Sequence, residues 1–178
     1  MALRSSVIKA QLQIADMDRH YYQDHNLTLA QHPSETDQRV MVRLLAFALN
    51  AHEDLKFSSN LSDEGESELS IMNLHGDPEL WVEFGLPDEK WLRKASQRSK
   101  VVKLYAYGGR SLPIWWKQNE KDLKRFENLS ILTLSDEAIE ALERMYQRSM
   151  SLQFSINEGA VLVSDGSHAV EIELEKLK

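Results

Sequence analysis

The chain has 178 residues, the length of one domain with a sizeable core, so we expect a single domain over residues 1–178. Its composition, 42% hydrophobic and 28% charged, excludes collagen-like and intrinsically disordered classes, and the absence of Cys excludes disulfide frameworks, thiolate nucleophiles and iron–sulfur clusters. The net charge of −7 opposes binding to phosphate, so a nucleic-acid partner requires a local basic patch.

The first predicted elements are a β-hairpin and a helix. Apolar residues alternate with polar ones over residues 6–32, which predicts an opening hairpin. A helix is expected to start at Ser34, a capping residue with Asp37 three positions on, and to run to about Ala51. Residues 58–67 are polar and predict an exposed loop.

The middle of the chain predicts a crossover between parallel strands. Short strands are expected at 69–74 and 79–84, followed by a helix that ends near residue 99 and a strand at 101–107. This strand–helix–strand order with short connections is typical of a right-handed crossover.

The remaining elements complete an α/β pattern. We expect a helix around 114–125, a strand at 129–134, a helix from Ser135 and an antiparallel meander of three strands over 154–174. The sequence therefore predicts an α/β fold with a mixed β-sheet, flanking helices and antiparallel N- and C-terminal strands.

Two carboxylates stand out on the predicted strand at 79–84. Glu79 and Glu83 share one face of it, with Trp81 between them. A carboxylate pair is enough to hold Mg²⁺, which completes its shell with water and phosphate oxygens. The alternative is an edge strand whose acids are solvated. A strand before a crossover helix is usually interior to its sheet, however, where a buried charge is costly unless it has a partner.

Two basic residues on the predicted helix that ends near residue 99 suit a phosphate-containing substrate. Lys94 and Arg98 are one turn apart and can lean over the strand to neutralise charge on phosphoryl oxygens. Snorkelling over a packed face or pairing with nearby acids is the alternative. Glu35 and Arg39 are also one turn apart, and an exposed pair of this kind is worth only a few tenths of a kcal/mol.

Motifs of other chemistries are absent. The sequence contains no GxSxG, GxxxxGK[ST] or GxGxxG pattern, which removes the usual support for a serine hydrolase, a P-loop NTPase or a dinucleotide-binding protein. It has neither the apolar core of a secretion signal nor a run of about 18 apolar residues. We therefore expect a cytoplasmic protein with no membrane partner.

Four segments carry a family resemblance: LTLAQHPSETDQRVMVRLLAFAL, ELWVEFGLPDEKWLRKAS, a Tyr-x-Tyr-Gly strand end and an Ile-Trp-Trp segment. They resemble the YaeQ family, and the resemblance runs nearly end to end. The fold of that family is similar to the PD-(D/E)XK nuclease fold. The resemblance thus implies a restriction-endonuclease-like core with an acidic helix, a strand hairpin, a strand carrying a carboxylate, a helix and a parallel strand.

The resemblance also implies site residues. That nuclease superfamily binds Mg²⁺ through an Asp and an acid-x-Lys triplet, often with a Glu from the first helix. Glu35 matches the helix position and Glu83 the acid of the triplet, while Gly85 stands where Lys is expected. Lys94, or Lys103 on the following strand, is a candidate replacement for that lysine.

Together these arguments predict a metal-dependent nuclease-like protein that acts on phosphodiester bonds with Mg²⁺ or Mn²⁺. The alternative is a non-catalytic binding or regulatory module on a degenerate nuclease fold, engaging a protein or a small anionic ligand. The expected catalytic residues are Glu83, Glu79, Glu35 and Lys94, with Glu83 and Glu79 as metal ligands; the expected substrate-binding residues are Arg39, which orients Glu35, Arg98 and Tyr107.

Overall fold

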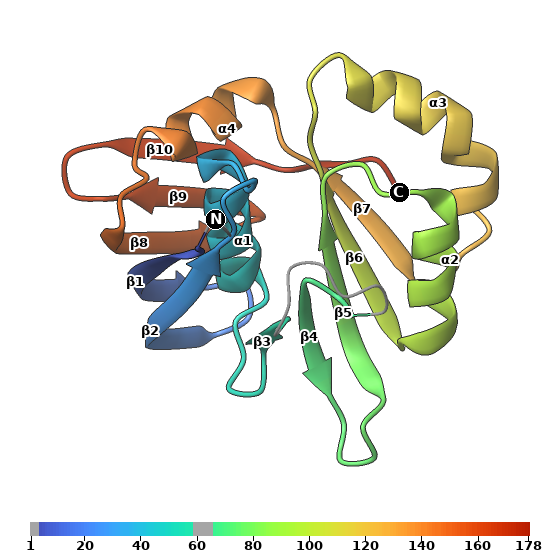
Figure 1. Cartoon of the computed structure of the whole chain (residues 1–178), viewed down its shortest axis with the longest axis horizontal. Coiled ribbons are helices and arrows are strands. Elements are labelled where there is room, and N and C mark those ends of the chain that lie inside the picture. Colours follow the sequence, from blue (N-terminus) through green and yellow to red (C-terminus); the bar gives the residue numbers. More distant parts are fainter. Residues whose placement is uncertain (1–3, 59–65) are drawn as a thin grey trace. The chain divides into compact units, whose positions relative to one another are not determined.

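The computed structural model describes residues 4–58 and 66–178, which form four helices and two mixed β-sheets (Figure 1). The predicted α/β class with mixed sheet is confirmed. The chain divides into two compact units, one made of Met1–Ala51 with Glu137–Leu174 and the other of His52–Asp136 with Glu175–Lys178. Most of the loop predicted at 58–67 falls on residues 59–65, outside the described residues.

The first unit contains a five-stranded sheet in the order β10-β9-β8-β1-β2. Strand β1 (Ser6–Asp16) pairs antiparallel with β2 (Tyr21–Gln31), so the predicted hairpin is confirmed. On its other side β1 pairs parallel with β8 (Ser149–Asn157). Strands β9 (Ala160–Ser164) and β10 (Ala169–Glu173) continue from β8 as the predicted antiparallel meander.

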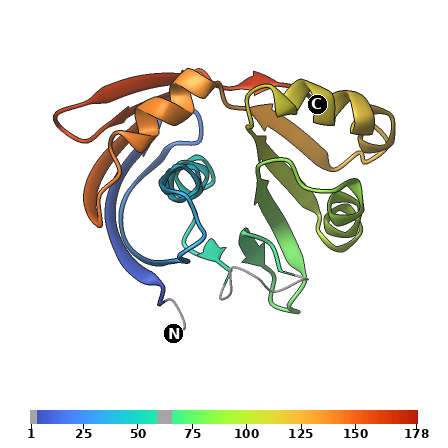
Figure 2. The same ribbon diagram turned by 45° about the horizontal axis from the view of Figure 1, so that its top comes forward.

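Helix α1 (Asp37–Leu49) covers one face of this sheet (Figure 2). Alternation along β1 turns Ile8, Leu12 and Ile14 into the core and leaves the intervening residues exposed. Helix α4 (Asp136–Glu143) lies beside α1, since Gln38 Nε2 donates to Glu143 Oε2 over 2.9 Å. The opposite face of the sheet presents mostly exposed side chains.

The start of α1 differs from the prediction. The N-cap is Thr36, whose side-chain oxygen accepts the Arg39 backbone N–H over 3.2 Å. Ser34, the predicted cap, instead shares a 2.6 Å hydrogen bond with His32 Nδ1 in the preceding turn. Glu35 therefore precedes the helix and is not part of its surface.

The second unit contains a six-stranded sheet in the order β11-β7-β6-β5-β4-β3. Strand β5 (Pro78–Phe84) pairs parallel with β6 (Val101–Ala106) across helix α2 (Glu89–Arg98), so the predicted parallel crossover is confirmed. β6 pairs parallel with β7 (Leu129–Thr133). The short strands at the two edges are β3 (Lys56–Phe57), β4 (Leu69–Met72) and β11 (Glu175–Lys176).

Helices α2 and α3 (Ser111–Leu123) lie on the same face of the second sheet (Figure 2). Helix α3 begins three residues before the predicted start at Ile114, and Pro113 occupies its first turn, where no N–H is required. Within residues 4–58 and 66–178, no helix is both long and apolar enough to cross a membrane.

Candidate functional site

Glu83 lies on β5 with its carboxylate in the core of the second unit. Trp81 and Glu83 are two residues apart and share the face that α2 and α3 cover, with 2% and 5% of their surfaces exposed. The indole Nε1–H of Trp81 donates to Glu83 Oε1 over 2.7 Å. The carboxylate singled out by the sequence is thus buried and bound by its own strand neighbour.

Glu79 has a different environment from Glu83. Four residues of extended strand separate their Cα atoms by about 13 Å, and the Trp81 side chain stands between them. Glu79 is 42% exposed and its Oε2 lies 3.4 Å from Lys100 Nζ. Two ligands of one Mg²⁺ each lie about 2 Å from the ion. The structure does not bring these two carboxylates together in that way, and the described residues contain no cluster of three or more His, Asp or Glu that could hold a metal.

Lys94 and Arg98 lie over aromatic rings. Lys94 Nζ is 5.1 Å from the ring centre of Trp91, and the guanidinium carbon of Arg98 is 5.6 Å from that of Trp81. The two tryptophan rings meet edge to face at 5.9 Å. These four residues form what we call the cation–aromatic cluster. Arg98 does lean over β5 as predicted, and what it covers is the indole that binds Glu83.

Gly85 occupies the position where the resemblance expects lysine. Its φ is +80°, in the left-handed region that favours glycine, and its N–H donates to the Tyr105 carbonyl over 2.9 Å. A Cβ built there meets no atom within 4 Å. A lysine would therefore strain the backbone and extend into open space, so the backbone geometry accounts for the glycine.

The predicted residues on β6 do not share the face of Glu83. Val82 pairs in register with Lys103 and Phe84 with Tyr105, which places both β6 residues on the face opposite Glu83. Lys103 is half-buried and Tyr105 buried. Tyr107 follows the last residue of β6 and is half-buried. Lys103 is therefore placed on the wrong side of the sheet to replace the missing lysine beside Glu83.

Glu35 forms a buried ion pair in the first unit. Arg43 Nη1 donates to both of its carboxylate oxygens, over 3.1 and 3.2 Å, and to the Ala30 carbonyl over 3.3 Å. The two charged side chains are 4% and 5% exposed. Glu35 is therefore paired with Arg43, a residue that the sequence analysis did not single out.

A polar network adjoins this pair at the beginning of α1. Gln31 Nε2 donates to Asp37 Oδ1 over 2.9 Å and to the Glu35 carbonyl over 3.1 Å, and the Tyr146 hydroxyl donates to Gln31 Oε1. Burial raises the pKa of Tyr146, and the charges of Asp37 and Glu35 raise it further. These bonds tie the chain after α4 to β2 and α1, which is a structural role.

Sequence reasoning missed Arg43 and the role of Trp81. Arg43 falls within the apolar arc of α1, between Val42 and Leu44, and a charge in such an arc signals a buried partner. The signal for Trp81 was its position two residues before Glu83, because an indole N–H on the same strand face lies within reach of a carboxylate.

Known proteins are similar to nearly the whole chain. A family model described as "YaeQ protein" matches residues 1–174. A relative from Salmonella typhi is 42% identical over 174 residues, covering 98% of this chain and 96% of the relative. A relative from Escherichia coli strain K12 is 40% identical with the same coverage. Both carry the name "Uncharacterized protein YaeQ".

Solved structures agree with this similarity. The crystal structure of the YaeQ protein from Xanthomonas axonopodis pv. citri superposes with a TM-score of 0.94 at 43% identity, covering 98% of each chain. That from Pseudomonas syringae superposes with a TM-score of 0.92 at 34% identity, covering 98% of this chain and 96% of the other. The chain belongs to the YaeQ family.

Proposed function

We propose that this protein is a non-catalytic binding module on a nuclease-like scaffold, and that it engages a small anionic ligand through the cation–aromatic cluster. The observation that carries the proposal is the bond between Trp81 and Glu83. A nuclease needs a carboxylate that faces its metal and water, whereas Glu83 is 5% exposed and accepts the indole N–H over 2.7 Å. Lys94, its expected cationic partner, lies over the ring of Trp91.

The scaffold is part of the proposal. The order of α1, the β4–β5 hairpin, α2 and the parallel strand β6 agrees with the core that the family resemblance implies. What the chain lacks is the acid-x-Lys lysine, since Gly85 takes a conformation with φ +80° that lysine avoids. A scaffold of this kind without its lysine retains a fold and a basic helix but not a hydrolytic centre.

The ligand class follows from local charge. Helix α2 carries four cations, Lys90, Arg93, Lys94 and Arg98, against the single acid Glu89, in a chain whose net charge is −7. Arg93 is paired with Glu89 over 2.6 Å, whereas Lys94 lies over the ring of Trp91, which holds this cation in place without neutralising its charge. Arg98 lies over the neighbouring ring of Trp81 and adds a second positive charge to the cluster. An anion is the ligand that such a cluster attracts.

The claim that the protein is not catalytic is tested by calorimetric titration of Mn²⁺ and Mg²⁺ into it. The same samples are then incubated with single-stranded and duplex DNA and RNA. The Glu83→Gln variant keeps an oxygen acceptor for Trp81 and removes the charge. We expect neither protein to cleave, and any metal uptake to be unchanged in the variant. Metal-dependent cleavage by the unmodified protein that the variant lacks would overturn the proposal in favour of the nuclease.

The claim that the cluster binds an anion is tested with inorganic tripolyphosphate as the probe. Tryptophan fluorescence is the readout, because Trp91 and Trp81 belong to the cluster. We expect Lys94→Gln or Arg98→Gln to weaken binding about tenfold each. The matched control is Arg125→Gln, whose side chain is 78% exposed and pairs with Asp122 over 3.9 Å. Equal weakening by all three variants, or no binding at all, would remove the cluster as an anion site.

A further inference from the structure

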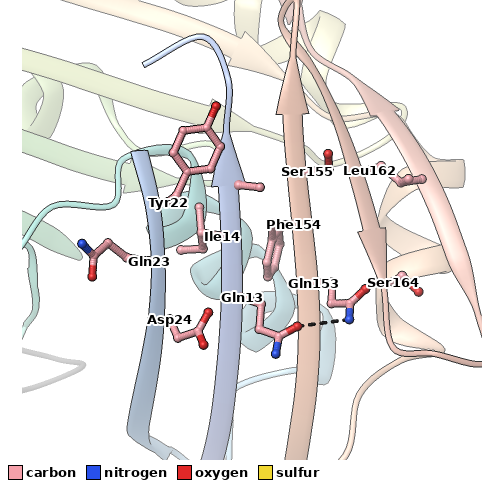
Figure 3. Close-up of a pocket in the computed structure, with 11 residues that line it drawn as sticks. Gln13, Ile14, Tyr22, Gln23, Asp24, Gln153, Phe154, Ser155, Leu162 and Ser164 are labelled. Atoms are coloured by element: carbon pink, nitrogen blue, oxygen red, sulfur yellow. Dashed lines mark hydrogen bonds between the residues drawn. The ribbon is translucent and has the colours of Figure 1, made fainter. Parts of the chain in front are cut away.

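A hollow of about 690 Å³ lies over the open face of the five-stranded sheet in the first unit (Figure 3). Its floor and walls come from β2, β1, β8 and β9, and α1 lies behind the sheet. Pockets that hold small molecules typically have volumes of about 300–1,000 Å³. The hollow is therefore large enough for a small organic ligand, and it shares no residue with the cation–aromatic cluster.

Cross-strand register explains why the sheet is hollow at this point. Tyr22, Ala15, Ser155 and Leu162 are successive partners across four strands. The two small residues form the floor, while Tyr22 and Leu162, 58% and 47% exposed, stand at the two ends. Three inter-strand spacings of about 4.8 Å separate these ends by about 14 Å. The hollow thus forms because two small side chains lie between two large ones along one row of the sheet.

The neighbouring row supplies hydrogen-bonding groups. Its members, in order across the same strands, are Asp24, Gln13, Gln153 and Ser164. Gln153 Nε2 donates to Gln13 Oε1 over 3.1 Å, which orients both amides (Figure 3). An amide has two N–H donors and two acceptor lone pairs, so this bond leaves Gln13 Nε2 as a donor and Gln153 Oε1 as an acceptor for a ligand.

The charge of the lining selects the ligand class. Among the described residues that line the hollow there is one charged side chain, Asp24, and no Lys or Arg. A carboxylate without a cation disfavours anions, which separates this hollow from the anion site proposed on α2. Paired donors and acceptors beside an exposed aromatic ring suit vicinal hydroxyl groups on a ring with an apolar C–H face.

We propose that this hollow is a binding site for a neutral, hydroxyl-rich ligand of saccharide type. Gln13, Gln153 and Asp24 bind its hydroxyl groups, and Tyr22 packs against its apolar face. The floor of Ala15 and Ser155 lets the ligand approach the sheet. This site goes beyond the proposed anion binding and does not depend on it.

The test is amide chemical-shift titration of the full chain with maltose, cellobiose and trehalose, and with spermidine as a cationic comparison. At least one disaccharide is expected to bind and to shift amides of β1, β8 and β2. Gln13→Ala, Gln153→Ala and Tyr22→Ala are each expected to weaken it about tenfold, while Tyr22→Phe retains the ring and most of the affinity. Ala15→Leu is expected to abolish binding by filling the floor.

Gln11→Ala is the matched control, because Gln11 is on the same strand and the same face but lies outside the hollow. All replaced side chains lie on the open face of the sheet, and the thermal midpoint of each variant verifies folding. Failure of all three disaccharides to bind, binding of spermidine alone, or equal weakening by Gln11→Ala and Gln13→Ala would each overturn the proposal. None of these outcomes bears on tripolyphosphate binding, so the two proposals fail separately.

Discussion

The indole N–H of Trp81 and the carboxylate of Glu83 meet over 2.7 Å, and both side chains are nearly excluded from water. A buried carboxylate is tolerated when hydrogen bonds replace its hydration. The same indole packs in the core between the sheet and α2, and its ring lies beneath the guanidinium of Arg98. One side chain therefore connects the buried acid, the core and the basic helix.

Replacing Trp81 by Phe tests this relationship. The variant retains an aromatic ring but loses the N–H, so Glu83 loses a donor inside the core. We expect the free energy of unfolding to fall by about 1–3 kcal/mol, measured by urea denaturation. Trp116→Phe, at a half-buried position on α3, serves as the control for indole size. Equal losses in the two variants would show that the hydrogen bond contributes nothing beyond packing.

Gly85→Lys restores the lysine that a nuclease would carry. Because φ is +80° and an added Cβ meets nothing within 4 Å, we expect the cost to come from backbone strain, about 1–2 kcal/mol. Leu74→Lys, at a fully exposed position, is expected to be nearly neutral. We also expect no metal-dependent DNA or RNA cleavage from Gly85→Lys. Cleavage by this variant would show that the site lacks nothing but its lysine.

Period-2 and period-3.6 patterns were enough to predict most of the fold. The hairpin β1–β2, the parallel pair β5–β6 and the C-terminal meander were predicted because each depends on local alternation and short connections. The parallel pairing of β1 with β8 was not predicted, since it joins segments more than 130 residues apart that carry no local signal of each other.

The candidate site was harder to predict than the fold. A shared strand face placed Glu79, Trp81 and Glu83 in line correctly, but periodicity does not say which neighbour a carboxylate binds. In the structure the indole of Trp81 binds Glu83, and Glu79 Oε2 lies 3.4 Å from Lys100 Nζ. Spacing also predicts that Glu35 pairs with Arg39 on the surface of α1. The helix begins after Thr36, whose hydroxyl is the cap, because the hydroxyl of Ser34 bonds to His32 in the preceding turn. Glu35 therefore lies before the helix, which spacing does not reveal.

Glu35→Ala tests the buried pair with Arg43. It leaves a guanidinium that is about 5% exposed without its carboxylate, so we expect a loss of about 3–5 kcal/mol in the free energy of unfolding. Glu89→Ala breaks the pair with Arg93, whose side chain is 52% exposed, and should cost less than about 1 kcal/mol. A loss for Glu35→Ala no larger than that for Glu89→Ala would mean that water replaces the carboxylate around Arg43.

Tyr146→Phe is expected to have a pH-dependent effect. At about pH 8 the variant loses the bond from the Tyr146 hydroxyl to Gln31, which costs about 1 kcal/mol. Burial, together with the charges of Asp37 and Glu35, raises the pKa of Tyr146 in the folded protein above its ordinary value of 10.0. A raised pKa means that the unfolded chain ionises first, so the stabilisation is complete below about pH 10 and is lost as the pH rises through the folded value. Urea denaturation of both proteins from about pH 8 to about pH 11 should therefore show that the difference in their free energies of unfolding closes at the alkaline end.

Tyr22→Phe, which removes an exposed phenol, is the control. A difference between the unmodified protein and Tyr146→Phe that widens at alkaline pH would contradict the buried network around Gln31.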